Sequence, residues 1–198
     1  MGLTSFAIAM KPFDADIQEA KTVLSAEGTL LYPTDTIWGL GCDATSEKAV
    51  AAVSKIKKRA EDKSYIVLMA DTQMLRKYLA NPHPDLETLV AEQKGPTTII
   101  YDSIIGIAEN ALAADGSLGI RIPKDQFCIA LLKRYGKPIL STSANESGQP
   151  SPKFYSQIQD EIRARVDYII NWRQDDETEK EPSRIIKINK DGSLLKIR

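Results

Sequence analysis

The densest group of side chains that could do chemistry follows a short apolar segment near the start of the chain. The run Thr34-Asp35-Thr36 offers two hydroxyls and a carboxylate, and Pro33 ends the apolar segment because proline cannot donate to a strand ladder. Gly39 and Gly41 come next and allow close approach to the backbone. This composition is typical of the wall of a binding site. A strand that ends in a turn with local side-chain hydrogen bonds would look the same.

A basic cluster lies near residue 57, where a predicted helix ends. It consists of Lys57, Lys58, Arg59 and, a few residues later, Lys63. Residues two apart cannot share one face of a helix, so either Lys57 or Arg59 is expected to turn inward where the helix ends. An arginine beside a lysine suits a polyphosphate, since arginine pairs with two oxygens and lysine adds a compact charge. Stabilisation of the helix C-terminus by the same cations is the alternative.

A single arginine stands in the otherwise apolar segment 118–122. Strand alternation puts Ser117, Gly119 and Arg121 on one face of this predicted strand. A half-buried arginine needs an anion, which could be the carboxylate of a ligand or a carboxylate of the protein itself. Arg121 is therefore either a ligand contact or one half of an internal salt bridge.

The segment 141–152 concentrates hydroxyl side chains after a short apolar strand. Ser141, Thr142, Ser143, Asn145 and Ser147 could form a cradle for an oxyanion or a phosphate together with backbone N–H groups. A solvated serine-rich loop is the alternative interpretation. The sequence has no GxxxxGK[ST] or GxGxxG motif, so a nucleotide would not bind through a P-loop or a Rossmann turn.

The composition narrows the function classes. The 198 residues are 42% hydrophobic and 27% charged, which predicts one soluble domain over residues 1–198. With 26 basic against 27 acidic residues, the net charge of −1 gives no general attraction to nucleic acid or membranes. Residues 1–10 lack the features of a signal peptide, and no segment is long and apolar enough to span a membrane. We therefore expect a cytoplasmic protein.

The cysteine and histidine content excludes further classes. Cys42 and Cys128 lie outside any CxxC pattern, which favours a reducing compartment and inert thiols. The single histidine, His83, lies between prolines and is expected in a surface loop. Zinc binding with recognisable ligand spacing and a Ser-His-Asp triad are both disfavoured.

Short apolar segments alternate with amphipathic ones, which predicts an α/β fold with a mixed sheet. Helices are predicted at residues 14–27, 46–59, 72–79, 85–93, 107–114, 125–135 and 153–165. Strands are predicted at residues 29–32, 65–69, 97–101, 118–122, 138–140 and 166–170, with a hairpin of 185–189 and 194–197. Residues 173–181 have low hydrophobicity and are expected to form a mobile, solvated loop.

Taken together, these clusters resemble the YrdC/YciO-like family, and most closely its threonylcarbamoyl-AMP synthase branch. The matching pieces occur in the family's order: Tyr32 to Thr36 with Gly39-Leu40, Lys57 with Arg59, Gly95 to Thr98, Ser117 with Arg121, and Ser141 to Asn145 with Gly148. The resemblance implies a single, three-layer α/β domain with a twisted mixed β-sheet flanked by helices. It also implies a concave, positively charged surface that holds the substrates.

The resemblance implies a nucleotidyltransferase that forms threonylcarbamoyl-AMP and pyrophosphate from ATP, L-threonine and bicarbonate. A separate tRNA threonylcarbamoyl transferase complex would use the product to modify adenosine 37 of tRNA (t6A37). Threonine contacts are implied for Thr34, Arg121, Ser141 and Ser183. ATP contacts are implied for Arg59, Lys63, Ser117, Ser143, Asn145, Ser151 and Arg198. Lys57 and Arg59 are the implied catalytic pair, and Mg²⁺ would arrive with ATP because no carboxylate cage is visible in the sequence.

The chain departs from the family pattern in several places. Trp38 stands where the family has Tyr or Phe, and Ala60 replaces a proline. The run Glu181 to Ile185 replaces a Pro-Ser-Thr-Val/Ile pattern, and Asn171 to Asp176 replaces glycines, so the role of this segment in covering the substrate is in question.

Two alternatives to the synthase stay open. They are a non-catalytic module that binds double-stranded RNA or the ribosome, and a YciO-like paralogue that acts on another ligand. Lys57, Arg59, Ser143 and Asn145 favour the synthase, because the YciO-like branch diverges at these positions. The departures at residues 171–185 point the other way. The net charge weakly disfavours a function limited to RNA binding.

Overall fold

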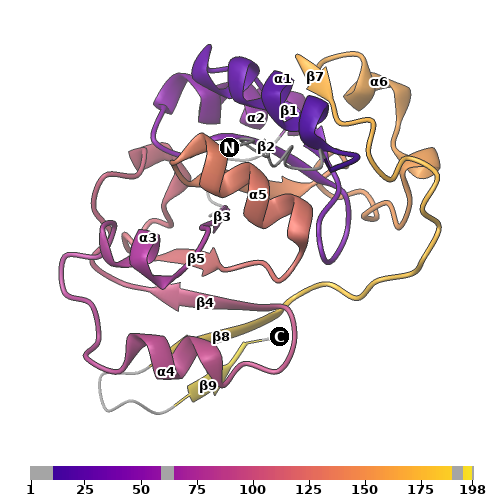
Figure 1. The fold of residues 1–198 in the computed structure, drawn as a ribbon. Coiled ribbons are helices and arrows are strands. Elements are labelled where there is room, and N and C mark those ends of the chain that lie inside the picture. The colour runs from indigo at the N-terminus through magenta and orange to yellow at the C-terminus, as the bar shows by residue number, and fades with distance from the viewer. Residues whose placement is uncertain (1–10, 59–64, 189–193, 198) are drawn as a thin grey trace, which may run out of the picture.

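A mixed β-sheet forms the centre of the computed structural model, which describes residues 11–58, 65–188 and 194–197. Within these ranges the sheet has nine strands in the order β7-β1-β2-β6-β3-β5-β4-β8-β9 (Figure 1). The strands are β1 (Leu30–Tyr32), β2 (Gly39–Asp43), β3 (Ile66–Leu68), β4 (Thr97–Tyr101), β5 (Leu118–Arg121), β6 (Ile139–Ser143), β7 (Tyr168–Ile169), β8 (Arg184–Ile188) and β9 (Leu194–Lys196). The pairs β1/β7, β3/β5 and β4/β8 are parallel and the others are antiparallel, which confirms the predicted mixed sheet.

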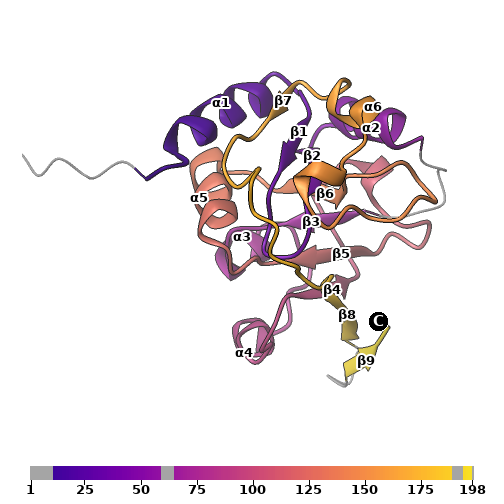
Figure 2. The same ribbon diagram turned by 90° about the vertical axis from the view of Figure 1, so that its right-hand side faces the viewer.

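Helices cover both faces of this sheet. They are α1 (Asp14–Ser25), α2 (Glu47–Lys57), α3 (Thr72–Arg76), α4 (Leu86–Ala91), α5 (Gln126–Tyr135) and α6 (Asp160–Arg163), with the 3-10 turns η1 (Glu109–Ala111) and η2 (Tyr155–Gln157). Figure 2 shows α1 and α5 together beside β1, and their apolar side chains form one core with the strands. The apolar face of α2 forms a second core against the other face. The resulting three layers agree with the predicted architecture.

The local sequence explains why β1 and α2 form where they do. Leu31 packs into the α2 core, whereas Leu30 and Tyr32 pack into the α1/α5 core, so both faces of β1 are buried and its apolar run is continuous. Ser46 begins α2 as predicted, because its hydroxyl accepts a hydrogen bond from the Ala49 N–H at 3.2 Å.

Strand β2 is an element that the sequence analysis did not predict. It was expected only that Gly39 and Gly41 would allow close approach, and glycine by itself disfavours a strand. The close approach is to the neighbouring strands: a Cβ atom at Gly41 would lie 2.3 Å from the Leu140 carbonyl oxygen and 2.8 Å from Cε1 of Tyr32. Tertiary packing therefore determines both the strand and the need for glycine.

Several other boundaries differ from the prediction. Strand β6 extends to Ser143, so the hydroxyls of residues 141–143 lie on a strand and not in a loop. The helix predicted at 107–114 is reduced to η1, and the one predicted at 153–165 is split into η2 and α6. Ile158 interrupts the latter with an extended conformation, and its side chain is buried. The C-terminal hairpin is confirmed as β8 and β9, although its predicted turn lies outside the described residues.

The segment between β7 and β8 is anchored where it begins. The buried carboxylate of Asp16, on α1, accepts hydrogen bonds from the backbone N–H groups of Asn171 at 3.1 Å and Trp172 at 2.8 Å. The Trp172 ring also packs edge-on against Phe13, with ring centroids 5.6 Å apart. These contacts with α1 therefore fix the position at which the segment 173–183 begins.

Candidate active site

A pocket of about 210 Å³ opens over the middle of the sheet. Strands β2, β6, β3 and β5 form its floor. Its walls come from the loop before β2 and from segments next to β3, β6 and β8. The lining residues are Thr34, Thr36, Ile37, Trp38, Gly39, Tyr65, Ile66, Arg121, Ser141, Thr142, Ser143, Ser151, Pro182 and Ser183. The pocket therefore joins segments that are far apart in the sequence.

The register of the strands explains why polar groups gather on this floor. Ser141 pairs with Gly41 on one side and with Ile66 on the other, and Ile66 pairs with Gly119. Side chains two residues apart on a strand point to the same face, so Arg121 follows Gly119 onto the pocket side. Ser141 and Ile66 of this row line the pocket together with Arg121.

Thr34, Thr36 and Arg121 form one hydrogen-bonded chain along the wall. The Thr34 hydroxyl donates to the Ile37 carbonyl at 2.7 Å and lies 3.0 Å from the Thr36 hydroxyl, which accepts a bond from Nη1 of Arg121 at 2.8 Å. Thr34 and Thr36 are both almost fully buried. The sequence analysis named Thr36 among the polar residues of the binding-site wall but assigned it no substrate contact.

Arg121 contacts other protein residues and also lines the pocket. Its Nη1 lies 3.5 Å from the Asp35 carboxylate, so the expected salt bridge within the protein exists. Its buried Nε has no hydrogen-bond partner in the described part of the chain. The guanidinium therefore has a carboxylate partner at Nη1 and a buried, unpaired donor at Nε, and the residue lines the pocket.

Ser183 completes the far wall. Its hydroxyl lies 2.9 Å from the hydroxyl of Thr98 on β4, and both side chains are buried. Pro182 lines the pocket beside it, so the segment that departs from the family pattern still reaches the site. The four residues predicted to contact threonine, Thr34, Arg121, Ser141 and Ser183, thus all line one pocket.

The residues predicted to contact ATP are distributed differently. Ser143 and Ser151 line the pocket. Ser117 lies outside the pocket lining and donates from both its N–H and its hydroxyl to the Asp115 carboxylate. The Asn145 amide donates to two carbonyls of its own loop, those of Glu146 and Gln149. Arg59, Lys63 and Arg198 lie outside the described residues. The roles of all these residues in ATP binding stay predictions.

Lys57, one of the two residues expected to turn inward, does so. Its side chain is 2% exposed, and Nζ donates to the carbonyl oxygens of Ser143 at 2.6 Å and Asn145 at 2.7 Å. The end of α2 is therefore fastened to the chain that leaves β6. This contact holds the loop next to the pocket, and the catalytic role predicted for Lys57 stays a prediction.

The remaining titratable groups have no visible part in the pocket. Burial raises the pKa of the free thiols of Cys42 and Cys128, so both stay protonated and unreactive, as expected. His83 lies in the loop before α4, where its Nδ1 accepts from the Asp85 N–H. Within the described residues, no group of three or more His, Cys, Asp or Glu side chains could hold a metal ion. No helix in the same ranges is long and apolar enough to cross a membrane.

The chain is similar to several known proteins. It is 31% identical to a threonylcarbamoyl-AMP synthase from Xanthomonas campestris over 163 residues, which are 81% of this chain and 87% of that protein. Two solved structures share its fold. P. abyssi Sua5 in complex with L-threonine matches with a TM-score of 0.76 at 22% identity, over 93% of this chain and 54% of that one. E. coli YciO matches with a TM-score of 0.80 at 23% identity, over 95% and 90%.

The chain therefore spans about half the length of P. abyssi Sua5 but nearly all of the other two proteins. A family model that covers Sua5, YciO and YrdC proteins, with the description "Telomere recombination", matches residues 22–198. This match includes every lining residue of the pocket. It spans most of the chain, so the chain belongs to the Sua5/YciO/YrdC family.

Proposed function

We propose that this protein is a threonylcarbamoyl-AMP synthase, which forms threonylcarbamoyl-AMP and pyrophosphate from ATP, L-threonine and bicarbonate. One observation carries the proposal: Thr34, Arg121, Ser141 and Ser183, which were assigned to threonine from the sequence, line a single pocket together with Ser143 and Ser151, assigned to ATP. The similarity to a synthase and to a Sua5 structure that contains L-threonine supports it.

The proposed reaction has two bond-forming steps. The amino nitrogen of threonine attacks the carbon of bicarbonate, and a carbamate forms with loss of water. A carbamate oxygen then attacks the α-phosphorus of ATP, and the bond to the bridging oxygen breaks as pyrophosphate leaves. Positioning and charge neutralisation supply most of the catalysis in such a transfer. Mg²⁺ would enter with the ATP phosphates and offset their charge there.

The chain's own groups suit these requirements. The guanidinium of Arg121 can hold the threonine carboxylate, and the hydroxyls of Thr34, Ser141 and Ser183 can orient its polar atoms. Ser143 and Ser151 line the same pocket and can contact the nucleotide. Lys57 supports this arrangement by holding the backbone at Ser143. Arg59, Lys63 and Arg198 are proposed to bind phosphate or ribose.

The product requires a consumer. We propose that a tRNA threonylcarbamoyl transferase complex takes it up for t6A37 modification, and that both proteins act in the cytoplasm. Two free, buried cysteines are consistent with a reducing compartment.

A pyrophosphate assay tests the proposal. Purified protein with ATP and Mg²⁺ should release pyrophosphate only when L-threonine and bicarbonate are both present, because the carbamate needs both. Reactions that lack either substrate, or that contain D-threonine, serve as controls. Pyrophosphate release without this double dependence, or no release at saturating substrates, would contradict the synthase.

The same protein preparation distinguishes the alternatives. Salt-sensitive binding to RNA duplexes without turnover would favour the RNA-binding module instead. Binding of ATP without any response to threonine would favour a paralogue with another ligand. The similarity to YciO does not decide between these outcomes, because it shows the fold alone.

A further inference from the structure

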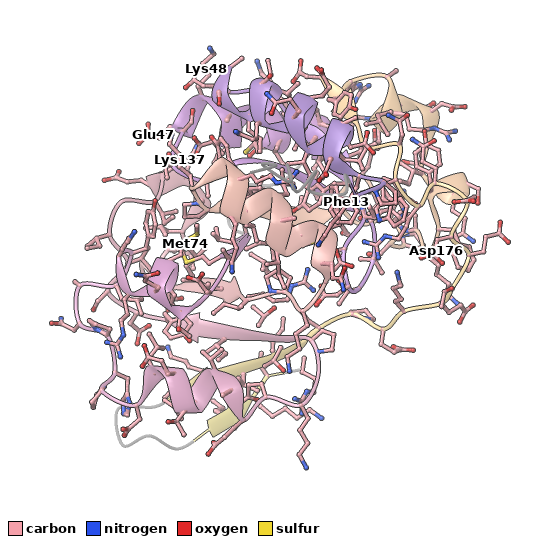
Figure 3. The ribbon with its side chains drawn as sticks, in the orientation of Figure 1. Phe13, Glu47, Lys48, Met74, Lys137 and Asp176 are labelled. Carbon is pink, nitrogen blue, oxygen red and sulfur yellow. The ribbon has the colours of Figure 1, made fainter. Side chains whose placement is uncertain are left out.

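A second cavity, which we call the α4 cavity, lies between helix α4 and the sheet. It has a volume of about 160 Å³, and most of its lining is apolar. The apolar walls come from Leu75 on α3, Val90 on α4, Ile99 and Tyr101 on β4, and Ile120 and Ile122 on or just after β5. Figure 3 labels Met74, the neighbour of Leu75 on α3. The α4 cavity therefore lies where two helices meet two adjacent strands.

Strand alternation keeps the α4 cavity apart from the substrate pocket. Ile120 lines the α4 cavity, whereas the next residue of β5, Arg121, lines the pocket. On β4, Ile99 lines the α4 cavity, whereas the hydroxyl of Thr98 lies 2.9 Å from that of Ser183 in the pocket wall. Successive side chains of a strand point to opposite faces of a sheet. The two cavities therefore lie on opposite faces and share no lining residue among the described ones.

The floor of the α4 cavity is buried, and side chains of the described residues do not fill the space above it. Leu75, Ile99 and Ile120 are almost fully buried. Tyr101 contributes its ring, because its hydroxyl is buried. Helix α4 has six residues, of which only Leu86 in the first turn is fully buried, so the space beside its second half stays open. Folded interiors contain few voids larger than a water molecule, so an open space of this size is unusual.

Thr97, Gln93 and Lys124 bring polar groups to the wall, and these groups already have partners within the protein. The hydroxyl of Thr97 donates to the Gly95 carbonyl at 3.0 Å. The side-chain amide of Gln93 donates to the Leu89 carbonyl at 2.9 Å, and the backbone carbonyl of Gln93 accepts from Nζ of Lys124 at 2.7 Å. A stable buried water needs about two to four polar partners, so these walls suit an apolar occupant better than water.

A groove on the surface adjoins the α4 cavity. The groove has a volume of about 470 Å³, and it shares the lining residues Val90, Ala91, Ile122 and Lys124 with the cavity. Ala91 and Lys124 are exposed, whereas Val90 and Ile122 are half-buried. A small molecule can therefore enter from solvent between α4 and the segment that follows β5.

We propose that the α4 cavity is a second binding site, which takes a small, uncharged, apolar molecule about the size of one aromatic ring. A cavity of about 150 Å³ lined by Leu, Ile and Phe side chains can hold benzene, and the α4 cavity is similar in volume and in kind of lining. Transfer of such a molecule out of water is favourable, whereas a strongly polar one would lose its hydration against these apolar walls. The site lies outside the substrate pocket, so this inference is independent of the proposed function.

Isoleucine-methyl NMR on the wild-type protein tests the proposal without any substitution. Benzene should shift the methyl signals of Ile99, Ile120 and Ile122 until the shifts saturate. The signals of Ile37 and Ile66, which line the substrate pocket, should stay unchanged. Pyrazine, a ring of the same size with two polar nitrogens, is the control ligand and should cause no saturable shift. No shift with benzene, shifts confined to Ile37 and Ile66, or equal responses to the two rings would each overturn the proposal.

Two variants of α4 test the location of the site. Val90→Phe places a ring inside the α4 cavity, and Leu89→Phe places the same ring at the neighbouring half-buried position, which lines neither the cavity nor the groove. We expect Val90→Phe to weaken benzene binding by about tenfold or more, because its ring occupies the space of the ligand. Leu89→Phe should leave the Kd within about twofold of the wild-type value. Titrations followed by the same methyl signals measure both constants.

A second substitution keeps the test valid if Val90→Phe does not fold. Val90→Met fills part of the cavity with a flexible side chain that adapts to its surroundings, so it should fold and weaken benzene binding less than Val90→Phe does. Unchanged benzene binding in every folded Val90 variant would overturn the proposal. An equal loss of binding in Leu89→Phe would also overturn it, because any disturbance of α4 would then abolish binding.

Discussion

At the scale of single residues, Arg121 combines contacts within the protein with the proposed contact to threonine. Its Nη1 donates to Thr36 and lies near Asp35, which fixes the guanidinium against the wall, while Nε is left without a protein partner. A donor held in place before the substrate arrives loses little conformational entropy on binding.

Arg121→Ala should chiefly impair the use of threonine. Loss of one charge-assisted contact is worth about 1.5–3 kcal/mol, so we expect the KM for threonine to rise roughly 10- to 100-fold, with a much smaller change for ATP. Initial rates of pyrophosphate release at varied threonine and varied ATP measure this. Arg121→Lys is the control that keeps the charge. Equal KM values for threonine in wild type and Arg121→Ala would remove Arg121 from the threonine site.

Residue types in the sequence identified most of the pocket but not the hydrogen bonds between its residues. Thr34, Ser141 and Arg121 stand out because hydroxyls and a charge interrupt apolar strands. The hydrogen bond between Thr36 and Arg121 was not predicted, because the sequence does not show which hydroxyl an arginine 85 residues away will reach. Helical geometry predicted that either Lys57 or Arg59 would turn inward, but not which one. The carbonyl acceptors of Lys57, at the end of β6 and in the loop after it, depend on tertiary packing.

At the scale of elements, the pocket floor depends on glycine in β2. Gly39 lies beside Ser141, and a Cβ there would be 3.1 Å from the Ser141 hydroxyl. Gly41, one row behind, is pressed against β6 and the ring of Tyr32. Both faces of β2 are thus covered. One faces the pocket and Tyr32, and the other packs into the α2 core.

Gly41→Ala should destabilise the fold strongly. The new methyl group would meet the Leu140 carbonyl oxygen at 2.3 Å, and β2 and β6 would have to separate. We expect a loss of about 3 kcal/mol in the free energy of unfolding, measured by urea denaturation. Gly95→Ala is the matched control, because nothing lies within 4 Å of its Cβ position, and its change should stay within about 0.5 kcal/mol. Similar urea midpoints for the two variants would contradict the packing argument.

The elements that sequence patterns mispredicted share one physical cause. Strand β2 contains two glycines that disfavour a strand locally, and it exists because β1 and β6 pair with it on both sides. The helix predicted at 153–165 has a suitable apolar period, but burial of Ile158 in an extended conformation divides it. In both cases tertiary contacts outweigh local propensity.

At the scale of the whole molecule, carboxylates held by hydrogen bonds set the response to acid. The Thr178 hydroxyl and N–H lower the pKa of Asp176 to about 2, and the Arg76 guanidinium lowers that of Glu87 to about 2. At Asp43, burial opposes ionisation, but hydrogen bonds from Lys137, Thr45 and Tyr135 outweigh it and keep the pKa below its usual value. All three carboxylates favour the folded state only while they are ionised.

Stability should therefore fall as the pH drops from about 4 towards 2. A carboxylate whose pKa is lower in the folded chain stabilises the fold above its unfolded pKa, near 4, and loses this contribution as the pH approaches its folded value. Urea midpoints at pH 7, 4 and 2.5 measure the effect, and Asp43→Asn should flatten part of the curve. A midpoint that stayed constant down to pH 2.5 would contradict these ionic contributions.

The fold class was predictable because it needs only the alternation of strands and helices. The order of the strands was not, because β3 inserts between β6 and β5 although it precedes both in the sequence. That insertion brings Ile66 beside Ser141 and places Arg121 on the same floor. The pocket therefore arises from a topology that no local pattern encodes.

The order in which the pocket is assembled has a consequence for biosynthesis. Its wall begins at Thr34 and is completed by Pro182 and Ser183, the segment that leads into β8. Domains emerge from the ribosome with their N-terminal part first. In a nascent chain β2 lacks its second partner until β6 is available, and the pocket has no far wall until residue 183 is free to fold back. A chain that stalls before that point lacks Pro182 and Ser183, and with them the far wall of the pocket.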